Sequence, residues 1–350
     1  MKILLVGENF RGAVLESIYN NLIKLGVSAE MINTHDFFKV SFLNRVLNKL
    51  LRVPHYFGPG VKKINEIVLR RTLKGGFDFI LFMKPILIYP ETILEIKKYS
   101  KIICLSMDKI SYSKVNSDYF YSSLPLFDLF LFNSSADDIK RAKNEFGAKK
   151  TYFLPFTADS NCYHPVEIPS VDKKKFGVDI VFIGTYAKNE KRVEYMERLC
   201  QEGYDVKMYG NNWNKLPWNS CLRRKNKIVS GNTPCEKMAK VIGVSKIILA
   251  FMREQINEPI ACRTFEIPLC GGFMLHQKTK EAEEFLLPDK EAVFFDSYEE
   301  MKNKIDFYLQ HPKLRDKIAK AGHRKILNCG TLNVDQVKKM VEILKNEFGK

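Results

Sequence analysis

The chain has 350 residues, 45% of them hydrophobic and 27% charged, which is typical of globular proteins and too long for one ordinary core, so we expect two domains. No window approaches about 18 uninterrupted apolar residues, which excludes a membrane-spanning helix. The apolar run after Met1 is short and leads at once into a glycine-containing turn, so we expect no signal segment.

The cysteines are scattered. Eight occur, at positions 104, 162, 200, 221, 235, 262, 270 and 329, and no two form a C-x-x-C pair. Zinc sites and redox motifs need that close spacing, because two thiolates must converge on one centre. We therefore expect reduced, mostly buried thiols and a cytoplasmic protein.

The net charge of +16 is concentrated in one segment. Between Lys39 and Lys74 lie nine Lys or Arg residues and one acid, Glu66. Apolar residues interleave with them at helical spacing. Three interpretations remain open: a solvated helix face over the core, a docking surface for an anionic membrane or acceptor, and nucleic acid. Nucleic acid is the least favoured, since no nucleic-acid motif accompanies the patch.

Short apolar strands alternate with amphipathic helices along the first half, which predicts a parallel sheet joined by crossovers. We expect strands at 3–6, 27–32, 79–83, 102–105, 129–132 and 151–154. Helices are expected at 13–25, 90–99 and 136–146, and the basic segment is helical as well.

The alternation of strands and helices stops at 155–175, where three prolines and a run of lysines predict a linker. It then restarts with strands at 179–183, 206–209, 247–250, 273–275 and 293–295. Helices are expected at 188–200, 234–242, 262–270, 298–310, 312–328 and 333–348. Two strand–turn–helix starts predict two Rossmann-like doubly wound α/β domains facing a cleft. We place them at 1–165 and 166–330, with a C-terminal helix at 331–350 packing back on the first.

The stretch 258–275 (EPIACRTFEIPLCGGFML) is the most informative for function. Arg263 and Glu266 share a helix face, and Cys270-Gly271-Gly272 ends that helix before a buried strand. Ligands bind outside the carboxyl ends of such strands, an arginine suits a diphosphate, and a carboxylate can accept from a ribose diol. The alternative is an ordinary surface ion pair.

Several segments together resemble a known family. They are 132–165, 179–186 (DIVFIGTY), 206–213 (VKMYGNNW), 263–275 and 286–322. In them the chain is similar to GT-B glycosyltransferases with a "glycosyl transferases group 1" C-terminal domain, especially the CgeB-like (spore-maturation-type) branch.

The resemblance implies a donor site in the second domain and retention of anomeric configuration. Glu258 and Glu266 have the family's spacing, which would place the first near the sugar and the second on the ribose. The other implied donor-binding residues are Gly184, Thr185, Tyr186, Lys188, Gly210, Trp213, Arg263 and Thr264. Gly184 could instead form a plain strand turn, and Trp213 could pack in the core rather than stack on a base.

The acceptor side is expected in the first domain. The loop with Gly7, Asn9 and Arg11 follows the first strand, and in GT-B proteins it faces the donor phosphates and acceptor; a plain tight turn is the alternative. Asp108, after the strand at 102–105, either positions the acceptor as a catalytic residue or caps the next segment. His276 is interpreted as a loop residue.

No Asp-x-Asp triplet occurs, so we expect no metal and no cofactor, with Arg263, Lys188 and backbone N–H groups stabilising the leaving diphosphate. The predicted activity is sugar transfer from a nucleotide sugar to a glycan, lipid-linked or protein acceptor in surface-glycan assembly. The enzyme would be cytoplasmic and peripheral on the inner face of the membrane. The alternatives are a sugar-nucleotide epimerase of the same fold and a non-catalytic binding protein that uses the basic surface.

Overall fold

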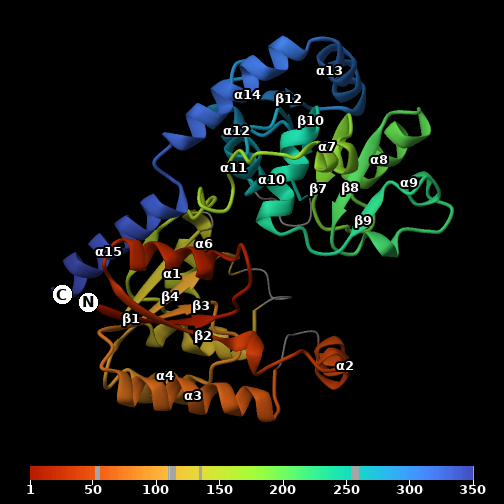
Figure 1. The fold of residues 1–350 in the computed structure, drawn as a ribbon. Coiled ribbons are helices and arrows are strands. Elements are labelled where there is room, and N and C mark those ends of the chain that lie inside the picture. Colours follow the sequence, from red (N-terminus) through yellow and green to blue (C-terminus); the bar gives the residue numbers. More distant parts are fainter. Residues whose placement is uncertain (52–55, 109, 111–115, 134–135, 254–259, 350) are drawn as a thin grey trace. The chain divides into compact units, whose positions relative to one another are not determined.

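The computed structural model describes residues 1–51, 56–108, 110, 116–133, 136–253 and 260–349. The chain forms two compact units (Figure 1). Unit 1 comprises Met1–Phe156 and Asn333–Lys350, and unit 2 comprises Thr157–Leu332. Each is built on a six-stranded parallel sheet, so the prediction of two Rossmann-like α/β domains is confirmed.

The sheet of unit 1 has the strand order β2-β1-β3-β4-β5-β6. Its strands are β1 (Lys2–Gly7), β2 (Ser28–Asn33), β3 (Phe79–Met83), β4 (Lys101–Ser106), β5 (Leu129–Phe132) and β6 (Thr151–Phe153). The central strands are buried on both faces, as parallel sheets require. The order reverses between β1 and β3, where such sheets bind ligands.

Helices cover both faces of this sheet: α1 (Val14–Lys24), α3 (Pro59–Gly75), α4 (Pro90–Ile96), α5 (Asp118–Ser123), α6 (Ala136–Asn144) and α15 (Asn333–Phe348). A further helix, α2 (Phe42–Leu51), precedes α3 and adds no residue to the hydrophobic core clusters of the described residues. Side chains alternate along β1, so Leu5 packs in the core beneath α1 and α15, and Leu4 packs with α3 and α4. The C-terminal helix lies against α1 in unit 1 (Figure 1), where Asn333 Nδ2 donates to Ser17 Oγ at 3.1 Å.

Unit 2 repeats the plan with the order β12-β11-β10-β7-β8-β9. Its strands are β7 (Ile180–Ile183), β8 (Val206–Gly210), β9 (Ile228–Ser230), β10 (Ile247–Ala250), β11 (Met274–Gln277) and β12 (Val293–Phe295). The helices are α7 (Ser170–Phe176), α8 (Lys191–Gln201), α9 (Cys221–Arg224), α10 (Cys235–Val244), α11 (Arg263–Leu269), α12 (Lys280–Phe285), α13 (Tyr298–Gln310) and α14 (Pro312–Leu327). The order reverses between β7 and β10.

Three local features differ from the predictions. The division falls at Thr157 rather than at 166, and α7, a helix with no buried residue, occupies part of the expected linker. His276 lies in β11 and is fully buried, not in a loop. No helix in the described part of the chain is long and apolar enough to cross a bilayer.

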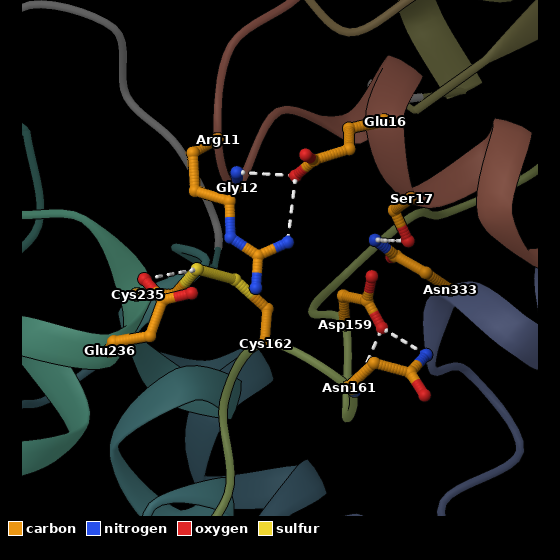
Figure 2. The surroundings of a disulfide bond; sticks show 10 residues. All are labelled: Arg11, Gly12, Glu16, Ser17, Asp159, Asn161, Cys162, Cys235, Glu236 and Asn333. Carbon is orange, nitrogen blue, oxygen red and sulfur yellow. Dashed lines mark hydrogen bonds and ion pairs between the residues drawn. A yellow bond between two sulfur atoms is a disulfide. The ribbon is translucent and has the colours of Figure 1, made fainter.

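The expectation that all cysteines are reduced is wrong for one pair. Cys162 and Cys235 form a disulfide in unit 2 (Figure 2). Their Cα atoms are 5.5 Å apart, within disulfide range, although 73 residues separate them in sequence. Cys104, Cys200, Cys221 and Cys270 are buried thiols.

Candidate functional site

Arg263 and Glu266 lie where the strand order of unit 2 reverses. The Arg263 guanidinium reaches the carboxyl end of β7, where its Nε donates to the Ile183 carbonyl at 3.1 Å. Its Nη1 forms an ion pair with Glu266, whose side chain is only 8% exposed, against 31% for that of Arg263. The pair is therefore not an ordinary surface pair, and it stands where doubly wound sheets bind ligands.

Thr264 and His276 anchor α11 to β11 behind this pair. Thr264 Oγ1 lies 2.8 Å from His276 Nε2, and both residues are fully buried. Burial lowers the pKa of His276 to about 4, so the ring is neutral near pH 7. The Thr264 hydroxyl therefore faces His276 in the core of unit 2.

The loops after β7 and β8 pack tightly against each other. Gly210 has φ of +133°, and a Cβ there would lie 2.3 Å from the Gly184 carbonyl oxygen, so only glycine fits. The Tyr186 N–H donates to the Asn211 carbonyl at 2.9 Å. Trp213 is fully buried, and its indole N–H donates to the Gly184 carbonyl at 2.7 Å. This burial favours the packing alternative for Trp213, which holds the loop in place.

Exposed Thr185 and Lys188 complete this edge of unit 2. Beneath them, Arg192 is buried, donates to the Thr185 carbonyl at 3.0 Å and pairs with Glu190. Arg192 was not predicted from the sequence, because its place in the first turn of an amphipathic helix is typical of a solvated residue. Glu258, predicted near the sugar, lies outside the described residues.

Unit 1 carries a pocket of about 730 Å³ at the carboxyl ends of β1, β3 and β4, also at a reversal of strand order. Gly7 allows β1 to approach β3 here, since a Cβ would lie 2.7 Å from Met83 Cβ. Lys84, with φ of +48°, forms an ion pair with Asp108 at the pocket wall. The polar lining residues are Glu8, Thr34, His35, Lys39, Lys84 and Asp108.

The predicted acceptor-side residues are only partly brought together. Gly7 and Asp108 line the pocket, whereas Asn9 and Arg11 are not among its lining residues. The Asn9 backbone N–H donates to Asn33 Oδ1 at 2.9 Å, and Arg11 pairs with Glu16 at 3.5 Å (Figure 2). Lys84 was missed, although its position directly after a buried strand is the signal that could have found it.

The Glu8, His35 and Asp108 side chains that face this pocket do not form a metal centre. Within the ranges that the structure describes, no three His, Cys, Asp or Glu side chains are grouped so as to hold a metal ion.

Comparisons with known proteins show which fold the chain has. A family model described as glycosyl transferase-like matches residues 190–340. The chain therefore carries a glycosyl transferase-like domain at residues 190–340, and over its whole length it has the fold of GT-B glycosyltransferase structures. No curated protein sequence matches the chain significantly.

Three solved structures illustrate the similarity. Sucrose-phosphate synthase from Thermosynechococcus elongatus is 12% identical with a TM-score of 0.65, and the match covers 100% of this chain and 99% of that one. A glycosyltransferase from Rickettsia africae is 15% identical with a TM-score of 0.64, covering 99% and 98%. Anabaena HepE in complex with UDP-glucose is 14% identical with a TM-score of 0.63, covering 99% and 100%.

Proposed function

We propose that this protein transfers a sugar from a nucleotide-diphosphate sugar to a hydroxyl acceptor, with retention of configuration and without a metal ion. The observation that carries the proposal is the Arg263–Glu266 pair at the strand-order reversal of unit 2. The similar HepE structure is a complex with UDP-glucose, which supports a nucleotide sugar as donor. The CgeB-like branch stays part of this proposal on the segments that resemble it.

Each donor-site group has a distinct task in this proposal. As the bond between the sugar C1 and the diphosphate oxygen breaks, negative charge grows on the leaving diphosphate. Arg263, Lys188 and the N–H groups after β7 would stabilise that charge without reorganising. Glu266 would accept hydrogen bonds from the ribose diol, and Glu258 would act near the sugar.

The acceptor is proposed to bind in unit 1, where Asp108 and Lys84 lie at the wall of the pocket. It would be a glycan, a lipid-linked molecule or a protein of surface-glycan assembly, and nucleic acid is not proposed. The enzyme would work in the cytoplasm at the inner face of the membrane.

A thermal-shift screen with uridine, guanosine, thymidine and cytidine diphosphates tests the donor half. A nucleotide at about 100 times its Kd stabilises the folded state by about 2.7 kcal/mol, so the right one should stand apart. If none shifts the melting temperature, the proposal fails. With the matching nucleotide sugar, slow release of nucleoside diphosphate without acceptor supports a transferase. Formation of an epimerised nucleotide sugar would instead identify an epimerase. The absence of any turnover would identify a non-catalytic binding protein.

A further inference from the structure

Helix α2 presents its apolar side chains to solvent. Phe42 and Leu50 are 77% and 72% exposed, and Leu43, Val46 and Leu51 are exposed as well. The residue it buries is polar: Asn44, whose side chain bonds the Ser41 hydroxyl and the Phe57 backbone. The helix is thus attached through an amide, while its apolar residues add little to the core of unit 1.

The neighbouring basic helix behaves differently. Helix α3 buries Val61, Ile64 and Val68 under the sheet and exposes Lys62 and Lys63 to water. The solvated-face interpretation of the basic segment therefore describes α3 and not α2. On α2, positions four apart share a side of the helix, so Phe42, Val46 and Leu50 form one apolar stripe.

The charged residues within α2 and next to it in the sequence are all basic. Lys39, Arg45 and Lys49 are exposed beside it, and no Asp or Glu occurs between Asp36 and Glu66 in the sequence. Aliphatic and aromatic side chains flanked by cations match the interface of an anionic bilayer, where the apolar groups enter the acyl boundary and the cations meet lipid phosphates. A second copy of the chain would bring the same positive charge, so symmetric pairing is disfavoured.

The stripe adjoins the pocket of unit 1 along the chain. Lys39 and Val40, directly before α2, line that pocket, and so does Tyr56 after it. Most of the pocket wall is apolar, including Phe10, Phe38, Val40, Ile86 and Leu87, and its ionic side chains include Glu8, Lys84 and Asp108. Such a lining suits a molecule with an apolar part and a hydroxyl-bearing polar head.

We infer that α2 seats unit 1 on an anionic membrane and that the adjoining pocket takes the head and first apolar segment of a lipid-linked acceptor from that membrane. The first part of this inference, the membrane half, concerns the contact of α2 with the membrane and depends only on residues of unit 1. The second part, the acceptor half, concerns the pocket; it rests on the proposed function and narrows its three acceptor classes to one.

Co-sedimentation with vesicles tests the membrane half. The vesicles contain phosphatidylglycerol and phosphatidylcholine in equal parts, or phosphatidylcholine alone. The variant Phe42→Ser/Leu50→Ser removes the two most exposed side chains of the stripe. Leu73→Ser/Leu94→Ser is the matched control, since it removes two leucines of unit 1 that are 50% and 51% exposed. Wild type and control should bind the anionic vesicles and release as salt rises. The α2 variant should bind on the order of tenfold more weakly for each side chain removed.

Several results would overturn the membrane half. Wild type could ignore anionic vesicles at low salt, or the control could lose binding as much as the α2 variant does. Light scattering could instead show a lipid-free dimer that the α2 variant abolishes, which would make a second copy the occupant. The nucleotide-induced thermal shift should be the same in all these proteins, so a failed donor site remains distinguishable from a failed membrane contact.

Octyl glucoside, used below its micelle concentration, tests the pocket. It should raise the melting temperature of wild type and of Phe42→Ser/Leu50→Ser, whereas glucose should not. Val40→Glu places a charge at the half-exposed rim of the pocket and should abolish that shift. An equal shift in Val40→Glu, or none in wild type, would overturn the acceptor half.

Discussion

Replacing Arg263 by alanine removes the guanidinium that joins α11 to the end of β7. Hydrogen bonds to a charged group contribute about 1.5–3 kcal/mol, and a fork-shaped donor can make two to a diphosphate. Arg263→Ala should therefore weaken nucleoside diphosphate binding by about 2–4 kcal/mol, which is roughly 30- to 1000-fold in Kd. Arg263→Lys keeps the charge without the fork and should lose less.

The same substitution also perturbs the folded protein. The Ile183 carbonyl loses its donor, and Glu266, with a side chain only 8% exposed, loses its cation. We expect a stability loss of about 1–3 kcal/mol, since a buried acceptor left without its partner costs about that much. Binding must therefore be measured well below the melting temperature of each variant.

Isothermal titration with the nucleotide chosen by the thermal-shift screen gives Kd directly. Arg198→Ala is the matched control, because Arg198 in unit 2 forms an exposed ion pair with Glu299 at 2.8 Å, of a kind that contributes little. An unchanged Kd in folded Arg263→Ala would remove Arg263 from the donor site. An equal loss in Arg198→Ala would show that the effect is general electrostatics.

Three further predictions concern the same unit. Wild type should bind a 2′,3′-dideoxy nucleotide about 1.5–3 kcal/mol more weakly than the corresponding ribonucleotide, and Glu266→Gln should largely lose this preference. If the variant keeps the full preference, Glu266 does not bind the ribose. Turnover should survive EDTA, because the sequence has no Asp-x-Asp triplet; loss on chelation that magnesium or manganese restores would overturn the mechanism. Burial lowers the pKa of His276 to about 4, so the unfolded chain takes up a proton at higher pH than the folded one, and stability should fall by up to about 3 kcal/mol as pH drops from about 6.5 to about 4. The free energy of unfolding, measured by urea denaturation at several pH values in that window, should depend less on pH in His276→Gln than in wild type. An equal pH dependence in the two proteins would contradict the assignment.

The sheets were predictable because their strands are buried on both faces and therefore appear as continuous apolar runs. Leu129–Phe132 and Ile247–Ala250 have the predicted bounds. Strand β9, Ile228–Ser230, was missed because it is a short, partly exposed strand at the sheet edge, without an apolar run. The disulfide was missed because it depends on a spatial approach of two segments that sequence spacing does not encode.

The candidate site was predictable only where its members are close in sequence. The spacing of Arg263 and Glu266 placed them on one helix turn, but the bond from Arg263 to Ile183 spans 80 residues. Trp213 shows a different limit. An indole serves equally well in a core or on a base, and only its burial beside Gly184 favours packing.

The basic segment shows how topology can decide what amphipathic pattern leaves open. Both α2 and α3 combine apolar residues with lysine and arginine, and both lie between β2 and β3. A crossover between strands of a parallel sheet needs one helix to cover the sheet face. Helix α3 fills that place and continues through Gly76 towards β3, so α2 is the additional helix and leaves its apolar residues in solvent. A second amphipathic helix within a single crossover therefore indicates an interaction surface. The vesicle experiment on Phe42 and Leu50 tests this interpretation of unit 1 directly.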